Sequence, residues 1–342
     1  LIRYPREDEI GPVRVSVGQR RGQSRAGASP LIIIYIFAVL VAIGTCLLFL
    51  PFTHHDDGFT PLVVALFTAT SAVTVTGLVV ENTTFYWTQS GQVILLGLMF
   101  VGGLGFMTFA TFLIILIGQR VTLSQRLLVR ESLGVNQLGG LVRMTVGVVI
   151  VSVGIQVVGF IVLAVRFWFI YTPGEAIWQA AFHSVSGFNN AGFVVLKEMG
   201  GLADFQGDWM ITGIMAVLIV LGSLSFVVIM EVVSRRKFAL FGLNTKIILV
   251  MTPLLLAFGM VVFLLFEYQN PGSIGSQSFG QKLVTSLFES INKTAGFTTV
   301  DYGATEQQTN LVFASLMFIG GASASVAGGI KINTFGVVLV AM

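Results

Sequence analysis

Charged residues are what this sequence lacks most. Only 10% of its 342 residues are Asp, Glu, Lys or Arg, and 55% are hydrophobic, whereas a soluble domain carries about 25% charged residues. This balance excludes a chain that folds wholly in water. Six windows contain no charged residue or histidine, and each is close to the roughly 20 residues that cross a hydrocarbon core: 30–51, 92–119, 145–165, 210–230, 247–266 and 310–330. We therefore expect six membrane-spanning helices in one membrane domain.

Cysteine and recognisable catalytic motifs are also scarce. Cys46 is the single cysteine, which excludes an intrachain disulfide and a cysteine-based metal cluster. No nucleophile elbow, phosphate-binding loop or metal-ligand spacing occurs, so we do not expect an enzyme. The cluster His54-His55-Asp56-Asp57 precedes a glycine and is interpreted as a solvated turn. The basic pI of about 9.1 is attributed to membrane topology, and no nucleic acid is expected as a partner.

The placement of basic residues predicts the orientation in the membrane. Most of the 19 lysines and arginines lie before the first span or in two alternate loops, at 1–30, 118–144 and 231–246. The positive-inside rule places these segments in the cytoplasm, which gives a multi-pass protein of the cell membrane with a cytoplasmic N-terminal segment, residues 1–30. The opposite loops, near 51–91, 168–209 and 267–309, carry more acidic than basic residues. Such a surface would concentrate cations.

The three outward loops share one pattern. Each contains a phenylalanine, then small or hydroxylated residues, then a glycine followed by a large apolar residue, in the segments Phe67–Leu78, Phe182–Phe193 and Phe288–Phe297. The recurrence at roughly 105 to 115 residues indicates an internal repeat. We predict an all-α membrane protein with three helix, re-entrant segment, helix units at 31–117, 145–230 and 247–342.

Re-entrant segments indicate a pathway, because non-helical backbone at membrane depth is tolerated only inside protein or beside a water-filled cavity. We predict short half-helices at 61–67, 176–182 and 283–288. The residues after them are candidates to coordinate a cation with their carbonyl groups, in a selectivity filter made of Thr74, Val75, Thr76, Gly77, Asn189, Asn190, Ala191, Gly192, Thr294, Ala295 and Gly296. A glycine that merely ends an interfacial helix is the commoner reading of one match, but three in register favour a pore.

Some polar residues near these loops keep two interpretations. The side chains of Asn189 and Asn190 either contribute carbonyl oxygens to an ion or brace the filter from behind. Glu81 and Asp301 either form an outer ring that attracts cations or are ordinary solvated charges. For His183, packing or hydrogen bonding behind the filter is favoured over metal ligation.

At these motifs the chain resembles the Trk/Ktr/HKT superfamily of potassium transporters, in particular the pore-forming subunit of bacterial Ktr and Trk systems. The matching segments are Thr74–Leu78, Phe188–Phe193, Thr294–Phe297 and Gly320–Lys331. The resemblance implies a pseudo-fourfold pore with one filter glycine per repeat, and glycine at every such position goes with K⁺. It also implies an intramembrane gating loop in the last span, formed here by Gly320, Gly321, Ala322, Ser323, Ala324, Ser325, Gly328, Gly329 and Lys331.

The resemblance carries further expectations. It implies a homodimer and a cytoplasmic regulatory subunit that binds a nucleotide and docks on the basic loops, with membrane lipids around the chain and Na⁺ dependence left open. A fourth repeat is not found, so we interpret the chain as a fragment of a longer protein. The third loop is shorter between its phenylalanine and its glycine than the other two. The alternative function is a secondary transporter that carries another cation or a small solute by alternating access. A non-conducting scaffold is the third reading.

Overall fold

The computed structural model describes residues 31–105, 108, 141–197, 201–206, 208–323 and 325–341. Within these ranges every regular element is a helix, and extended pairing is limited to two isolated bridges. The all-α class is therefore confirmed. The predicted cytoplasmic segment 1–30, most of the basic loop 118–144 and the gate residue Ala324 lie outside the described residues.

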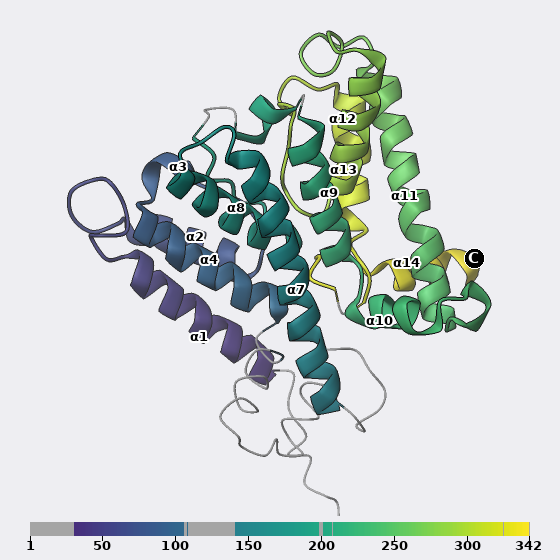
Figure 1. Cartoon of the computed structure of the whole chain (residues 1–342), viewed down its shortest axis with the longest axis horizontal. Helices are drawn as coiled ribbons and strands as arrows, with labels where there is room; N and C mark the ends of the chain where they lie inside the picture. The colour runs from purple at the N-terminus through teal and green to yellow at the C-terminus, as the bar shows by residue number, and fades with distance from the viewer. Residues whose placement is uncertain are drawn as a thin grey trace, which may run out of the picture.

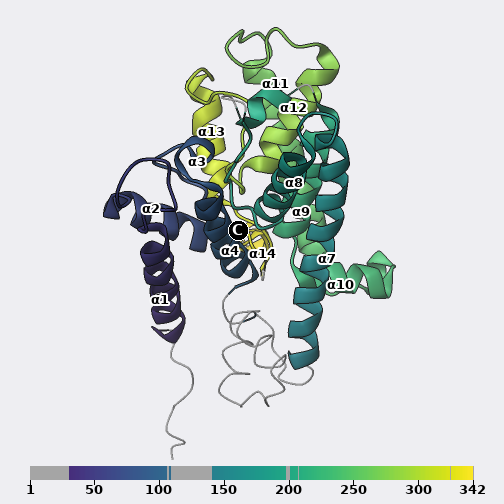
Figure 2. The same cartoon turned by 60° about the vertical axis from the view of Figure 1, so that its left-hand side comes forward.

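Three short helices each lie beside the longer helix that precedes them in sequence. Helix α2 lies along α1, α8 along α7 and α12 along α11, as the views in Figures 1 and 2 both show. The elements are, in order, α1 Leu31–Leu48, α2 Leu62–Val73, α3 Thr83–Tyr86, α4 Gln89–Leu104, α7 Leu141–Phe167, α8 Pro173–Phe188, η2 Gly201–Phe205, α9 Trp209–Ser223, α10 Phe226–Arg235, η3 Phe238–Leu240, α11 Leu243–Glu267, α12 Phe279–Asn292, α13 Gln307–Phe318 and α14 Ile332–Ala341.

The short helices have defined starts and run further than the predicted half-helices. Proline stands at the first position of α8, where its missing N–H costs nothing. Helix α12 begins with a capping box, in which Ser278 Oγ accepts from Gln281 N at 3.4 Å and Gln281 Oε1 accepts from Ser278 N at 3.1 Å. The hydroxylated residues that follow each phenylalanine continue the helix, so the non-helical segments begin closer to the glycines than we predicted.

The prediction of one spanning helix over 210–230 is wrong. Among the described residues, α7 from Arg143 and α11 are long and apolar enough to cross a membrane, and α9 with α10 makes a third if this pair is counted as one span. That pair is bent by 96°, because Leu224 is extended and Ser225 Oγ caps a new helix by accepting from Val227 N at 3.2 Å. The 210–230 window is thus not one helix. The 310–330 window stops being helical at Phe318, just before the segment where the family resemblance implies a break.

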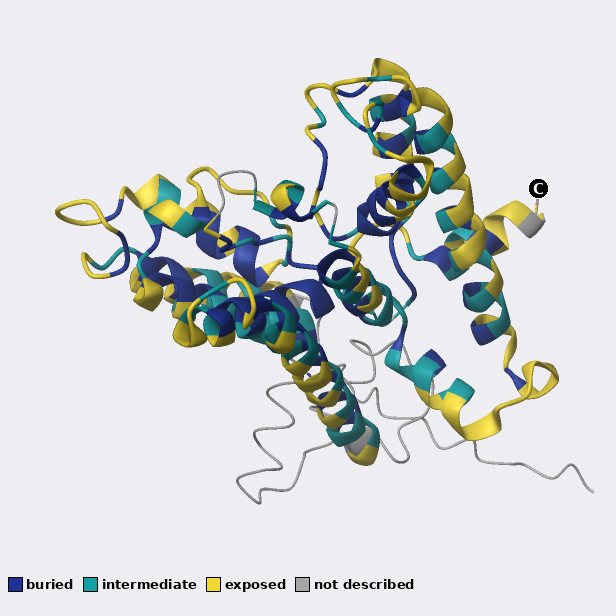
Figure 3. Cartoon of the chain, turned by 45° about the horizontal axis from the view of Figure 1, so that its top comes forward, coloured by how far each residue is buried: buried dark blue, intermediate teal, exposed yellow. Residues whose placement is uncertain are grey.

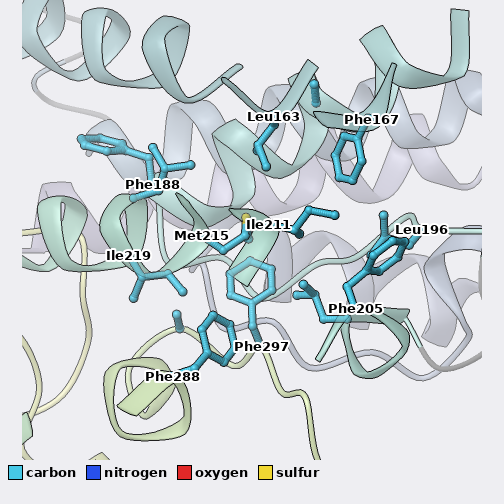
Figure 4. Close-up of a cluster of buried hydrophobic side chains, with 14 of the residues drawn as sticks. Leu163, Phe167, Phe188, Leu196, Phe205, Ile211, Met215, Ile219, Phe288 and Phe297 are labelled. Atoms are coloured by element: carbon cyan, nitrogen blue, oxygen red, sulfur yellow. The ribbon is translucent and has the colours of Figure 1, made fainter. Parts of the chain in front are cut away.

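Aromatic and aliphatic side chains fill the space between α7, α8, α9 and α12. In Figure 4, Met215 and Ile219 of α9 lie between the side chains of α7 and those of Phe288 and Phe297. Helices α8 and α9 approach closely, since a Cβ at Gly222 would overlap the carbonyl oxygen of Phe188. Burial gathers on these inner faces, whereas the C-terminal end of α10 and much of α11 are exposed (Figure 3). The packed centre therefore holds the ends of α8 and α12 in fixed positions.

Replacing Asp208 by alanine is expected to destabilise α9 by about 1–2 kcal/mol. Asp208 Oδ1 accepts from the backbone N–H groups of Met210 and Ile211 at 3.0 and 3.2 Å, and Oδ2 pairs with Arg166 Nε at 2.7 Å. Asp208→Asn keeps the cap and loses only the partly exposed ion pair, which is worth under about 1 kcal/mol. Thermal unfolding in detergent measures both variants. If both variants lose the same amount of thermal stability, the ion pair with Arg166 and not the helix cap stabilises the start of α9.

Candidate ion-conduction site

Each short helix ends the same distance before its glycine. The last residues of α2, α8 and α12 are Val73, Phe188 and Asn292. Each lies the same number of residues before its glycine, which is Gly77, Gly192 or Gly296. The shorter spacing noted in the third loop therefore lies inside α12 and not in the loop itself. The three loops can be compared residue by residue from the helix ends onward.

The three glycines meet in space and share a left-handed backbone. Their φ angles are 80° at Gly77, 73° at Gly192 and 75° at Gly296, values that side chains rarely adopt. A Cβ at Gly77 would lie 2.6 Å from Ala191 O, and one at Gly192 would lie 2.7 Å from Ala295 O and 3.0 Å from the Cα of Gly77. The structure thus brings together loops that lie far apart in sequence, with carbonyl groups beside each glycine.

The first two loops leave their helices through the same hydrogen bonds. Thr76 N bonds to Ser71 O and Ala191 N bonds to Ser186 O, both at 2.8 Å. Val75 and Asn190 sit at the left-handed position of these Schellman turns, with φ of 54° and 55°. Asparagine tolerates this conformation, whereas a β-branched valine is strained there. Such strain is held by surrounding structure and is typical of functional sites.

Asn190 braces the loops with its side chain. It is buried, its Nδ2 donates to Ile219 O at 3.2 Å, and its Oδ1 accepts from Ser223 Oγ at 3.1 Å and from Thr294 Oγ1 at 3.2 Å. Its amide oxygen is therefore occupied by two hydroxyl groups, which favours bracing over a direct contact with an ion. One residue joins the second loop, the third loop and the end of α9.

The helix ends add a favourable potential for cations. Helices α2, α8 and α12 all point their C-terminal ends toward the converging glycines, and each end carries the equivalent of about half a negative charge. Lys293 at the end of α12 is buried and adds one positive charge there. Sequence reasoning did not single out this lysine.

The segment between α13 and α14 is non-helical and folds back on itself. Gly320 N bonds to Ile330 O and Ile330 N bonds to Phe318 O, both at 2.9 Å. The described residues of the predicted gate therefore occupy a break between two helices. Lys331 Nζ donates to Ala327 O at 2.6 Å, so the last residue of this segment is bonded to backbone within the same segment.

This broken segment is attached to the end of α9. Ala322 N donates to Ser223 O at 3.0 Å and Val326 N donates to Gly222 O at 3.3 Å. These bonds use carbonyl groups that the end of a helix leaves without intrahelical partners. Ser223 therefore contacts the second and third loops with its hydroxyl and the broken segment with its carbonyl.

A cavity of about 300 Å³ lies between the first loop and the broken segment. Its lining includes Thr74 and Val75 from the first loop, Gly102 to Gly105 at the end of α4, and Ser325 and Val326. Both stretches of irregular backbone thus border a hollow, which is the condition for such backbone at membrane depth.

The histidine and acidic predictions have mixed outcomes. His54 is not solvated: it is 5% exposed, its Nδ1 lies 3.0 Å from Thr60 Oγ1, and its ring stacks on Tyr86. That interpretation was wrong because a folded-back loop covers the ring, while His55 and the two aspartates stay exposed. Within the described part of the chain, no three His, Cys, Asp or Glu side chains gather to hold a metal. Glu81 and Asp301 are both exposed.

Besides Lys293, two further residues next to the loops escaped sequence reasoning. Ser223 has no special neighbours in the sequence, and only the bend after it reveals its place. Glu289 gave a signal that could have been used, because a carboxyl group within a re-entrant membrane segment is costly and is by default functional. His183 lies behind the second loop, as predicted, with Nδ1 2.8 Å from Gln179 O.

The chain is similar in sequence to known cation transport proteins. A family model described as TrkH, cation transport protein, matches residues 18–340. The chain is 36% identical over 313 residues to the Ktr system potassium uptake protein B of Bacillus subtilis (strain 168), covering 91% of this chain and 69% of that protein. It is 34% identical over 307 residues to the potassium/sodium uptake protein NtpJ of Enterococcus hirae, covering 90% and 67%.

A solved structure has a similar fold. The potassium transporter TrkH from Vibrio parahaemolyticus superposes with a TM-score of 0.68 at 20% identity, and the match covers 94% of this chain and 62% of that one. The chain thus spans less than two thirds of that transporter's length. At this identity the likeness concerns the fold alone.

Proposed function

Because the chain belongs to the TrkH family of cation transport proteins, we propose that it forms the ion pathway of a potassium uptake system in the cell membrane. The observation that carries the proposal is the meeting of Gly77, Gly192 and Gly296, all left-handed and all close to a neighbouring loop's backbone. Three short helices end at this point, and the partial negative charges at their C-terminal ends create a potential that attracts a cation.

In the proposed pathway, a cation loses water at the loops and moves into the cavity beneath them. Backbone carbonyls of Thr74 to Gly77, Asn189 to Gly192 and Thr294 to Gly296 replace the hydration shell. We propose that the three loops are repeats of one unit, which their equivalent positions support. Ion flow is passive, since the proposal needs only a pathway and an electrochemical gradient.

The broken segment from Gly320 to Lys331 is the proposed gate. Ser325 and Val326 of this segment line the cavity, and backbone hydrogen bonds to Gly222 and Ser223 hold the segment there. These bonds can be exchanged for bonds to water when the cavity fills, so the segment can move without melting a helix.

The proposed ion is K⁺, because glycine stands at all three loop positions. Relatives are named for potassium uptake and, in one case, for potassium and sodium. The phrase "Ktr system" in two of these names denotes a system with other components. We extend the proposal to a homodimer with a nucleotide-binding cytoplasmic subunit, and to a cytoplasmic N-terminus.

The test is growth of a potassium-uptake-deficient bacterium on low K⁺. The full-length gene that encodes this chain is expressed with its regulatory subunit, as wild type and as Gly77→Ser. The wild type is expected to restore growth, and the serine variant is expected to lose its preference for K⁺ over Na⁺. If the wild type reaches the membrane and growth is not restored, the potassium proposal fails and coupled transport of another solute takes its place.

A further inference from the structure

The carboxyl group of Glu289 is buried behind the third loop, away from the proposed ion pathway. Its exposed fraction is 0%, and four donors surround it. Oε1 accepts from the backbone N and from Oγ1 of Thr299, both at 2.8 Å. Oε2 accepts from the hydroxyl of Tyr302 at 3.0 Å and from Thr298 Oγ1 at 3.4 Å. All four donors belong to the segment that leaves the loop just after Gly296.

Such a contact holds backbone in place more firmly than packing does. Hydrogen bonds are directional, so four of them fix the position of this segment relative to α12. Removal of the acceptor would leave a buried N–H and several hydroxyl groups unpaired. Glu289 is on α12, so it ties the segment after the glycine to the same helix that precedes the glycine.

The second loop has a contact of the same kind. His183 of α8 is 1% exposed, and its Nε2 accepts from the backbone N of Val195 at 3.4 Å. Val195 and Thr299 stand at equal distances after Gly192 and Gly296 in the sequence. By contrast, Leu78, Val79 and Val80 after Gly77 are exposed. Two different side chains thus reach the same backbone position in two loops.

We propose that Glu289 and, more weakly, His183 are positioning residues that fix the segment after the loop glycine and thereby set the discrimination between K⁺ and Na⁺. This inference rests on the proposed function. Neither side chain needs to touch an ion. Each acts by keeping the carbonyls before its glycine at one spacing, because the loop is held on both sides.

The test compares two buried glutamates. Glu267 is also 0% exposed and accepts four hydrogen bonds, including one from Glu306 N at 2.9 Å and one from Asn270 Nδ2 at 2.7 Å, but it joins the end of α11 to α13. Full-length Glu289→Ala, Glu289→Gln and Glu267→Ala are reconstituted with the regulatory subunit in vesicles. The readout is the ratio of K⁺ flux to Na⁺ flux, with thermal unfolding measured in parallel.

The expected result is a ratio that falls roughly tenfold in Glu289→Ala, which corresponds to about 1.4 kcal/mol of differential ion binding. Glu289→Gln should restore part of the ratio, because its amide oxygen still accepts from both Thr299 groups. Glu267→Ala should lower the unfolding temperature and leave the ratio unchanged.

The inference is overturned if Glu289→Ala slows both fluxes alike, or if Glu267→Ala changes the ratio as much. Should the alanine variant fail to accumulate, Thr299→Val decides the matter, since it removes one donor and preserves side-chain volume: an unchanged ratio overturns the inference. A wild type without K⁺ preference would instead refute the proposed function, so the two failures are distinguishable.

Discussion

Replacing Gly192 by alanine is expected to reduce K⁺ uptake by at least about tenfold, the effect of roughly 1.4 kcal/mol. Gly192 is the middle of the three glycines, and its added Cβ would lie 2.7 Å from Ala295 O and 3.4 Å from the Cα of Gly296. Its φ of 73° adds backbone strain of roughly 1–2 kcal/mol for any other residue. Both effects push the second loop away from its neighbours.

The measurement is initial K⁺ uptake by cells expressing the full-length protein, normalised to the amount in the membrane. Gly213→Ala is the matched control: this glycine is inside α9, and an added Cβ meets no atom within 4 Å. Its uptake should match the wild type. If K⁺ uptake by Gly192→Ala equals that of the Gly213→Ala control, Gly192 is not part of the ion pathway.

Replacing Gly320 by alanine is expected to raise K⁺ flux in the absence of the regulatory subunit, by roughly tenfold. A Cβ at Gly320 would overlap the carbonyl oxygen of Gly328 and lie 3.0 Å from the Cα of Gly329. The segment cannot keep its folded-back arrangement around a methyl group there. The proposed gate would consequently lose its closed position while the loops above it stay intact.

Flux into vesicles that lack the regulatory subunit reports on this change. Gly328→Ala places the same methyl group in the same segment, where it meets no atom within 4 Å, so flux should rise far less. Similar flux in both variants would mean that the packing of Gly320 against Gly328 does not control the pathway. A fall in the ratio of K⁺ flux to Na⁺ flux would place the damage in the loops.

The parts of the fold that sequence predicts well are those marked by local chemistry. Gly77, Gly192 and Gly296 could be identified because a left-handed turn selects glycine at one position of each repeat. The break after Phe318 could be predicted because glycine, a poor helix former, recurs at Gly320, Gly321, Gly328 and Gly329. In both cases the residue type carries the structural information.

Other features depend on neighbours that are distant in sequence. A hydropathy window measures composition, so it cannot register that Ser225 caps a new helix and turns the chain by 96°. His54 looks like part of a polar turn until Thr60 and Tyr86 cover it. The role of Glu289 depends on donors that return to it only after the loop has turned.

Ser223 touches the filter loops and the broken segment at once, and this has a thermodynamic consequence. In the proposed pathway, movement of the broken segment would free the carbonyl group of Ser223, whose hydroxyl donates to Asn190. If opening of the pathway changes the affinity of the loops for an ion, then binding of that ion must change the equilibrium between the closed and open states by the same factor. This follows because thermodynamic linkage is reciprocal. The identity of the permeating cation would then help to determine how long the pathway stays open.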